Sequence, residues 1–154
     1  KWRNQLKKSE KQGLKIKLAH QGDTFDWLLK RHEESRKSKR LRMPASPFIS
    51  AISLTIRNKQ GTLIFTAVKN RQPVSGILVF KHGATATYYV GWNSEEGRLL
   101  NANNLLLWCA IKELKGRGVK WFDLGGVDGF SMAGVSRYKM GLGGNLYTLA
   151  GTYF

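Results

Sequence analysis

The sequence has few acidic residues and almost no cysteine. Ten Asp and Glu residues face 26 Lys and Arg residues in 154 positions, which gives a net charge of +16. The one cysteine, Cys109, excludes an internal disulfide, and no group of Cys and His residues has the spacing of a zinc site. We therefore expect no metal, and a buried structural thiol at Cys109 in a reducing compartment.

Long hydrophobic runs are also lacking. The longest strongly apolar stretch, 105–111, is far too short to span a bilayer, and no signal peptide is visible. Residues 1–42 carry 14 basic and 5 acidic side chains, and the remainder carries 12 and 5, so the excess extends through the chain. Such a field attracts phosphates, nucleic acid and anionic lipid head groups. We expect a cytoplasmic protein, with peripheral contact at the inner face of the membrane as a further option.

The sequence predicts one α/β domain over residues 1–154. Hydrophobic residues make up 42% of the chain, which is enough for a core. Apolar spacing predicts helices at 1–12, 25–37, 48–58, 101–116 and 135–140, with Asp23 or Thr24 capping the second. Alternation and turn residues predict strands at 14–19, 62–68, 74–81, 85–91, 119–124 and 146–154. The strands at 62–68, 74–81 and 85–91 form an antiparallel meander, so we expect a mixed sheet with helices on both faces.

This order of elements matches the fold of the GNAT acyltransferases, and individual motifs resemble a narrower group, the FemABX family. The resembling segments are residues 1–8 with Gly13, 88–91, 104–108 continuing to Gly118, 122–129, and 134–139 with Gly143 and Gly144. Each motif alone is weak, but all of them occur in the family's order and cover nearly the whole chain.

The resemblance implies transfer of an aminoacyl group from aminoacyl-tRNA to an amine of a peptidoglycan precursor in bacterial cell-wall synthesis. Family members contain two GNAT-like domains, so this chain would be the second, with a GNAT-like domain upstream. The chain begins with Lys1 inside a helical pattern, and we expect a fragment of a longer protein. No cofactor is implied.

One departure from acetyl-CoA-dependent GNAT enzymes concerns the phosphate-binding segment. Those enzymes usually bind pyrophosphate at a helix start with an Arg/Gln-x-x-Gly-x-Gly/Ala pattern, whose glycines let backbone N–H groups approach closely. The corresponding residues here, 93–103, contain one glycine and two adjacent acids, Glu95 and Glu96. Acetyl-CoA is therefore a poor fit.

Two residues are predicted to be catalytic. Lys139 matches the lysine of the family's aromatic-Lys motif, which would stabilise the oxyanion formed when an amine attacks an ester carbonyl. A lysine is more often solvated than functional, but the flanking motif reverses that preference. Tyr89 matches a tyrosine near the substrate and would bind it or relay a proton. The alternative is that Tyr88 or Tyr89 only fills the core, since neighbouring strand residues face opposite sides.

Five residues are predicted to bind substrate. Arg42 would grip a phosphate, although the family's tyrosine four residues later is replaced by Ser46. Tyr138 is expected mainly to pack, and Asp123 mainly to cap the glycine turn at 125–126. Arg3 and Lys7 share a helix face that would meet tRNA or membrane, or be simply solvated.

Three functions remain open at this stage. The first is the Fem-type aminoacyl transfer. The second is a GNAT-like N-acyltransferase that uses another donor, acyl-CoA or acyl carrier protein. The third is a non-catalytic basic module that binds nucleic acid, which charge alone supports because no recognised nucleic-acid-binding motif is present.

Overall fold

The computed structural model describes residues 1–56, 59–127, 133–148 and 150–151. Among these residues, five strands form one sheet in the order β1-β2-β3-β4-β5. The first four are antiparallel, and β5 runs parallel to β4. The strands are β1 (Lys15–Ala19), β2 (Thr62–Lys69), β3 (Gln72–His82), β4 (Thr85–Asn93) and β5 (Trp121–Asp123). The predicted mixed sheet and its antiparallel meander are confirmed.

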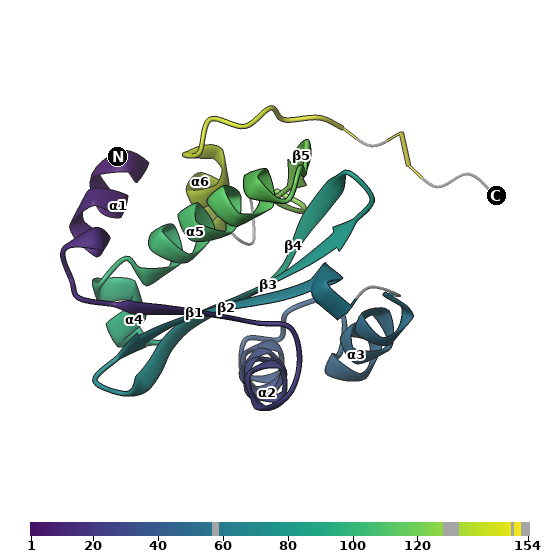
Figure 1. The fold of residues 1–154 in the computed structure, drawn as a ribbon, viewed down its shortest axis with the longest axis horizontal. Helices are drawn as coiled ribbons and strands as arrows, with labels where there is room; N and C mark the ends of the chain where they lie inside the picture. Colours follow the sequence, from purple (N-terminus) through teal and green to yellow (C-terminus); the bar gives the residue numbers. More distant parts are fainter. Residues whose placement is uncertain (57–58, 128–132, 149, 152–154) are drawn as a thin grey trace.

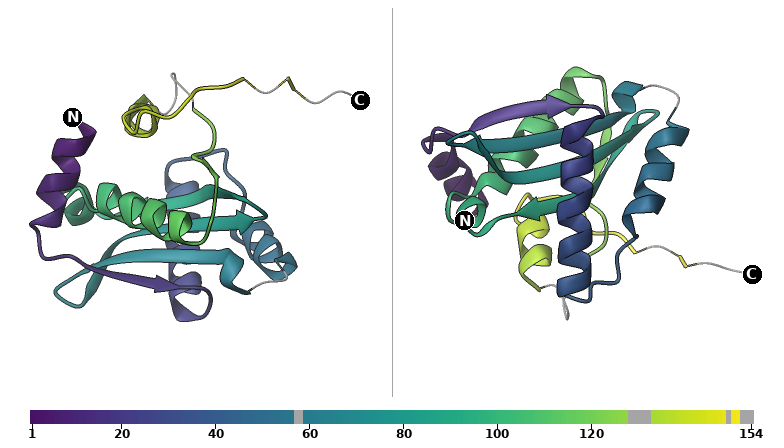
Figure 2. Two further views of the ribbon diagram at one scale, coloured as in Figure 1. Left: turned by 45° about the horizontal axis from the view of Figure 1, so that its top comes forward. Right: turned by 90° about the horizontal axis from the view of Figure 1, so that it is seen from below.

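Helices cover both faces of the sheet (Figure 1). One side carries α1 (Trp2–Glu10), α4 (Glu95–Leu99), α5 (Ala102–Gly116) and α6 (Ala133–Met140). The other carries α2 (Asp23–Ser38) and α3 (Ser46–Thr55), which lie side by side in Figure 2, and a short 3-10 turn, η1 (Lys59–Gly61), precedes β2. The α/β architecture predicted from the sequence is therefore correct.

Two apolar clusters hold these layers together, because β2 and β3 are buried on both faces and successive side chains alternate between them. On the α5 side, Leu63, Phe65 and Val79 pack against Leu106 and Leu107 of the helix. On the α2 and α3 side, a second cluster contains Leu28, Leu29, Ile49, Ile64, Leu78, Phe80 and Val90. Both surfaces of the central strands are thus core.

Several predicted boundaries need correction. Gly22, with a positive φ of 78°, stands at the N-cap of α2, and neither Asp23 nor Thr24 caps it. Helix α3 begins two residues earlier than expected because Pro47 fits the first turn, where its missing N–H costs nothing. The short helix α4 was not predicted, although Ser94 followed by two acids is a helix-start pattern.

The predicted terminal strand at 146–154 is wrong for the residues that the structure describes. Residues 146–148 and 150–151 have no strand pairing, and Leu146 and Tyr147 are each 65% exposed. Residues 149 and 152–154 lie outside the described part. Alternating side chains make a strand only where a sheet edge offers backbone partners, and these residues meet none.

Candidate acyl-transfer site

The site begins where β4 and β5 stop pairing. Strand β5 pairs with β4 over three positions and ends at the pair Thr87 and Asp123. Beyond Thr87, β4 continues to Asn93 with no partner strand on this side among the described residues. The end of this pairing, after Thr87 and Asp123, is the opening between β4 and β5.

A bulge in β4 separates the two neighbouring tyrosines. Val79 pairs with Tyr88 and Leu78 pairs with Val90, so Tyr89 is an extra residue on β4. Tyr88 packs with the α5 cluster, whereas Tyr89 packs with the α2 and α3 cluster, where its ring lies 5.2 Å from that of Phe80. The two rings therefore lie on opposite faces of the sheet.

Lys139 on α6 contacts the Tyr88 side of this opening. Its Nζ donates a hydrogen bond of 2.8 Å to the carbonyl oxygen of Gly126, which follows β5. The same Nζ lies 6.0 Å from the centre of the Tyr88 ring on β4. The Lys139 ammonium thus lies next to both β4, at Tyr88, and the segment after β5, at Gly126, where the pairing of the two strands ends.

Burial lowers the pKa of Lys139, and the Asp123 carboxylate opposes that shift. Burial also raises the pKa of Tyr88 to about 12. At neutral pH Tyr88 is therefore a neutral phenol beside a cation whose charge is held in a partly desolvated place. Such a cation acts more strongly on nearby charge than a solvated lysine does, because the screening is weaker.

Asp123 shapes the turn that Lys139 contacts. Its Oδ1 accepts a hydrogen bond of 2.8 Å from the N–H of Gly125, as the capping prediction expected. Gly125 has a φ of +72°, a left-handed conformation that favours glycine, and the turn places the Gly126 carbonyl toward Lys139. The carboxylate thus both holds the turn and supplies a negative charge near the lysine.

Tyr138 anchors α6 to the rest of the domain. Its hydroxyl donates a hydrogen bond of 2.8 Å to the carbonyl oxygen of Asn103, in the first turn of α5. Its ring lies 6.4 Å from that of Trp2 on α1, and burial raises its pKa. These contacts suit the packing role expected for Tyr138, and they hold α6, the helix that carries Lys139, against α1 and α5.

The other predicted site residues lie apart from Lys139. Tyr89 belongs to the opposite cluster, as described above. Arg42 is exposed in the loop between α2 and α3. Arg3 and Lys7 are exposed on α1, whose buried residue Leu6 faces the domain. The structure therefore groups Lys139, Asp123 and Tyr138 and leaves the other four apart, and the catalytic and substrate-binding roles of all seven residues stay predictions.

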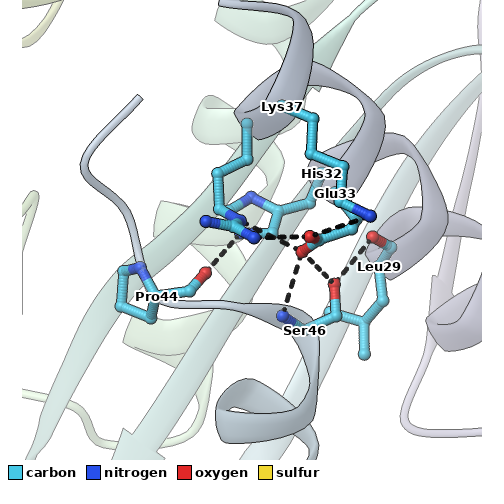
Figure 3. Close-up of polar contacts among 7 residues, drawn as sticks. Leu29, His32, Glu33, Lys37, Pro44 and Ser46 are labelled. Carbon is cyan, nitrogen blue, oxygen red and sulfur yellow. Dashed lines mark hydrogen bonds and ion pairs between the residues drawn. The ribbon is translucent and has the colours of Figure 1, made fainter. Parts of the chain in front are cut away.

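The loop that carries Arg42 is held by two residues that the sequence did not reveal as important (Figure 3). The Nε2 of buried His32 lies 2.8 Å from the Pro44 carbonyl oxygen. The Glu33 carboxylate accepts hydrogen bonds of 3.3 Å from both the N–H and the hydroxyl of Ser46, at the start of α3. Hydrogen bonds from Arg36 lower the pKa of Glu33 to about 2. Scattered histidines and a helix carboxylate give no sequence signal for such a clamp.

Tyr88 and Asn103, which contact Lys139 and Tyr138 respectively, were not among the predicted site residues. Tyr88 needs space that Gly91 provides, because a Cβ at Gly91 would overlap the Tyr88 hydroxyl. A glycine three residues after an aromatic residue in a strand was the available signal, since it often marks a bulge or a close approach.

The start of α4 does not fit a pyrophosphate. Its first-turn N–H of Gly97 is already bonded at 3.0 Å to the Ser94 hydroxyl, and Glu95 and Glu96 are exposed in the same turn. Two carboxylates at this helix start repel phosphate oxygens, which the helix dipole would otherwise attract. The residues present therefore argue against CoA phosphates at this helix start.

The described residues contain no group of three or more His, Cys, Asp and Glu side chains that would hold a metal ion. Within the same residues, no helix is long and apolar enough to cross a membrane.

Solved structures with this fold include several acetyltransferases and FemX. An aminoglycoside acetyltransferase from an uncultured soil metagenomic sample, in complex with trehalose, is 15% identical with a TM-score of 0.64, and 92% of this chain and 95% of that chain are covered. A ribosomal-protein-alanine N-acetyltransferase from Brucella melitensis biovar Abortus 2308 is 11% identical with a TM-score of 0.62, covering 92% and 99%. FemX is 11% identical with a TM-score of 0.70, covering 82% of this chain and 48% of that chain.

Such low identities establish the fold alone. Among curated proteins, none matches the sequence significantly. The model of the acetyltransferase (GNAT) domain family matches residues 1–140, which is most of the chain. The chain therefore belongs to the acetyltransferase (GNAT) domain family and is an acyltransferase domain.

Proposed function

We propose that this domain transfers an aminoacyl group from aminoacyl-tRNA to an amine of a peptidoglycan precursor, as Fem-type enzymes do. The observation that carries the proposal is the place of Lys139. Its ammonium contacts Gly126 after β5 and Tyr88 on β4, at the opening between the two strands. An acyl group bound in that opening would have a cation next to its carbonyl oxygen.

In the proposed reaction the acceptor amine attacks the ester carbonyl of the aminoacyl-tRNA. A C–N bond forms, negative charge develops on the carbonyl oxygen, and the Lys139 ammonium stabilises that charge. The ester C–O bond then breaks, and the ribose oxygen leaves with the proton that the amine gives up. Asp123 and Tyr138 act as positioning residues, because they hold the turn and the helix that present Lys139.

Three features favour tRNA over CoA as the donor. The acids at the start of α4 oppose a pyrophosphate, as described above. The net charge of +16 suits a polyanionic donor, which a basic protein surface attracts over long distances. The fold likeness to FemX is compatible with a second half upstream, since this chain covers 48% of that chain.

The proposal gives substrate-binding or catalytic roles to four further residues: Arg42, Arg3, Lys7 and Tyr89. Arg42 would bind a phosphate of the substrate from the loop that His32 and Glu33 hold. Arg3 and Lys7 would face the tRNA backbone on the exposed side of α1. Tyr89 would act on the α2 side of β4, away from Lys139. The proposed donor and acceptor would place the enzyme in the cytoplasm.

A direct comparison of donors tests the proposal. The full natural protein that contains this domain is incubated with a precursor peptide bearing a free amine. The donor is either tRNA charged with radiolabelled amino acids or labelled acetyl-CoA. We expect label to enter the peptide from charged tRNA only.

Transfer from acetyl-CoA alone would favour the second function, an N-acyltransferase that uses acyl-CoA or acyl carrier protein. That alternative draws support from the acetyltransferases that share the fold. The third function, a non-catalytic module that binds nucleic acid, is disfavoured because the chain belongs to an acyltransferase family.

A further inference from the structure

Helix α3 packs Ile49 and Ile52 against the domain, yet it also leaves large apolar side chains exposed. Two of its serines contact the protein: the Ser46 hydroxyl donates to the Leu29 carbonyl oxygen at 3.1 Å, and the Ser53 hydroxyl lies 3.0 Å from that of Thr62. By contrast, Leu54 is 86% exposed and Phe48 is 57% exposed. An ordinary surface helix turns its apolar side inward and its polar side to water.

The exposed side chains of α3 form one continuous face. With 3.6 residues per turn, Pro47, Phe48, Ala51 and Leu54 fall on the same side of the helix, and all four are exposed. Ile49, on the opposite side, is fully buried. No residue of α3 is charged. The outward face of this helix is therefore mainly apolar, and the exposed Thr55 is its polar residue, at the end of the helix.

Cations border this face, and no acid accompanies them in the sequence. The segment that joins α2 to α3 carries exposed Lys39, Arg40 and Arg42. No Asp or Glu occurs between Glu34 and Glu95. An apolar helix face next to a group of unbalanced cations is typical of elements that lie in the surface of an anionic membrane.

The charge around this face helps to decide which partner would cover it: a second copy of the chain, a nucleic acid or an anionic bilayer. A second copy of the chain would bring the same cations against one another, which is unfavourable. A nucleic acid would bind the cations but would leave Phe48 and Leu54 without apolar partners. An anionic bilayer offers phosphates for the cations and acyl chains for the apolar side chains.

We infer that α3 is a membrane-docking helix, which inserts Phe48 and Leu54 into the surface of an anionic bilayer while the preceding loop contacts lipid phosphates. The docking face is distinct from α6 and Lys139, which lie on the other side of the sheet (Figure 1). The inference does not depend on the identity of the acyl donor.

Vesicle flotation tests this inference without any measurement of activity. The full natural protein is mixed with vesicles of phosphatidylcholine alone or of equal parts phosphatidylcholine and phosphatidylglycerol. We expect the protein to float with the mixed vesicles only, and less at high salt, which screens the cations. The double variant Phe48→Ser, Leu54→Asn should bind at least about tenfold more weakly, because two apolar side chains no longer insert.

Two matched controls separate docking from general effects. Leu99→Asn removes an exposed leucine on α4 and should leave flotation unchanged. Lys39→Gln with Arg40→Gln should weaken binding to the mixed vesicles, whereas Lys112→Gln with Lys115→Gln, two exposed lysines on α5, should weaken it less. All these side chains are exposed, so circular dichroism should show an intact fold for each variant.

Equal flotation of the wild type and the Phe48, Leu54 variant would overturn the inference, as would failure of the wild type to float. Sedimentation velocity covers a further outcome. A wild-type dimer that the double variant abolishes would assign the face to a second copy of the chain and also overturn it.

Discussion

The ammonium of Lys139 lies 6.0 Å from the centre of the Tyr88 ring, within the range of a cation–π contact. The two residues come from α6 and from the bulged part of β4, so their contact joins the last described helix to the central sheet. The ring favours the charged lysine, and the Gly126 carbonyl accepts one of its hydrogens. The site therefore keeps a cation at the strand opening although burial lowers the lysine's pKa.

Lys139→Met should lower turnover by about 10²–10³, the usual loss for one oxyanion donor. Acceptor affinity should change less, because the charge acts mainly in the transition state. Lys139→Arg should restore activity only in part, since a planar guanidinium does not replace a compact ammonium. Steady-state kinetics of the complete enzyme measures these effects. Lys112→Met, at an exposed position of α5, is the control, and similar activity of the Lys139 and Lys112 variants would remove the catalytic assignment.

The activity should fall at alkaline pH as Lys139 loses its proton. Burial lowers this pKa from the ordinary value of 10.5, so the decline should begin at lower pH than an exposed lysine would give. Asp123→Asn should move the decline to still lower pH, because the carboxylate raises the lysine's pKa, while the asparagine Oδ1 can still accept from the Gly125 N–H. Rate profiles against pH measure the shift. The control is Asp26→Asn, at an exposed position of α2, which should leave the pH profile unchanged. An unmoved pH profile for Asp123→Asn would show that Asp123 does not raise the pKa of Lys139.

Acetyl-CoA should not bind tightly. The acids in the first turn of α4 repel its pyrophosphate, and the Ser94 hydroxyl already occupies the Gly97 N–H. Titration calorimetry should give a Kd weaker than about 1 μM, which corresponds to about −8 kcal/mol. Titration with CoA alone shows whether any heat depends on the acetyl group. A micromolar or tighter Kd would restore acyl-CoA as the donor.

Glu33 should stabilise the domain in a pH-dependent way. Its pKa falls from 4.5 to about 2 in the folded protein, chiefly because Arg36 donates hydrogen bonds to it. A lowered carboxyl pKa stabilises the fold above the unfolded value, and that contribution is lost as pH falls through the folded value. Thermal unfolding should show wild type more stable than Glu33→Gln at neutral pH, with the difference shrinking below about pH 4.5 and vanishing near 2.

Glu34→Gln provides the control for Glu33. Glu34 pairs with Arg31 at 2.9 Å, but the side chains are 42% (Arg31) and 49% (Glu34) exposed, and solvent-exposed pairs contribute little to stability. A pH dependence in Glu34→Gln equal to that of Glu33→Gln would show that the hydrogen bonds of Glu33 with Arg36 and Ser46 are not its cause.

The order of elements was readable from the sequence because it depends on local periodicity. The three strands of the meander and the long apolar helix α5 have side chains spaced for burial, and each appears at nearly the predicted residues. The capping role of Asp123 was also readable, since its carboxylate needs to reach only two residues along the chain to Gly125. The exposed positions of Arg3 and Lys7 follow from their place on the charged side of an amphipathic helix.

Other features depended on which distant groups meet. The bulge at Tyr89 depends on how β4 pairs with β3, and Gly91 signals a bulge in β4 without showing which residue is the extra one. The prediction of a terminal strand was wrong for residues 146–148 because these residues pair with no sheet edge. Likewise, the clamp of His32 and Glu33 on the Arg42 loop needs α2 and α3 to pack side by side (Figure 3).

The sequence by itself determined most of the elements, their order and the excess of positive charge, because these follow from local spacing and composition. Only the tertiary structure decided that Lys139 joins Tyr88 rather than Tyr89 and that α3 turns Phe48 and Leu54 to the outside. The physical reason is the same in both cases. Side-chain direction follows from strand register and from the face on which a helix packs, and both are fixed by contacts between residues far apart in the chain.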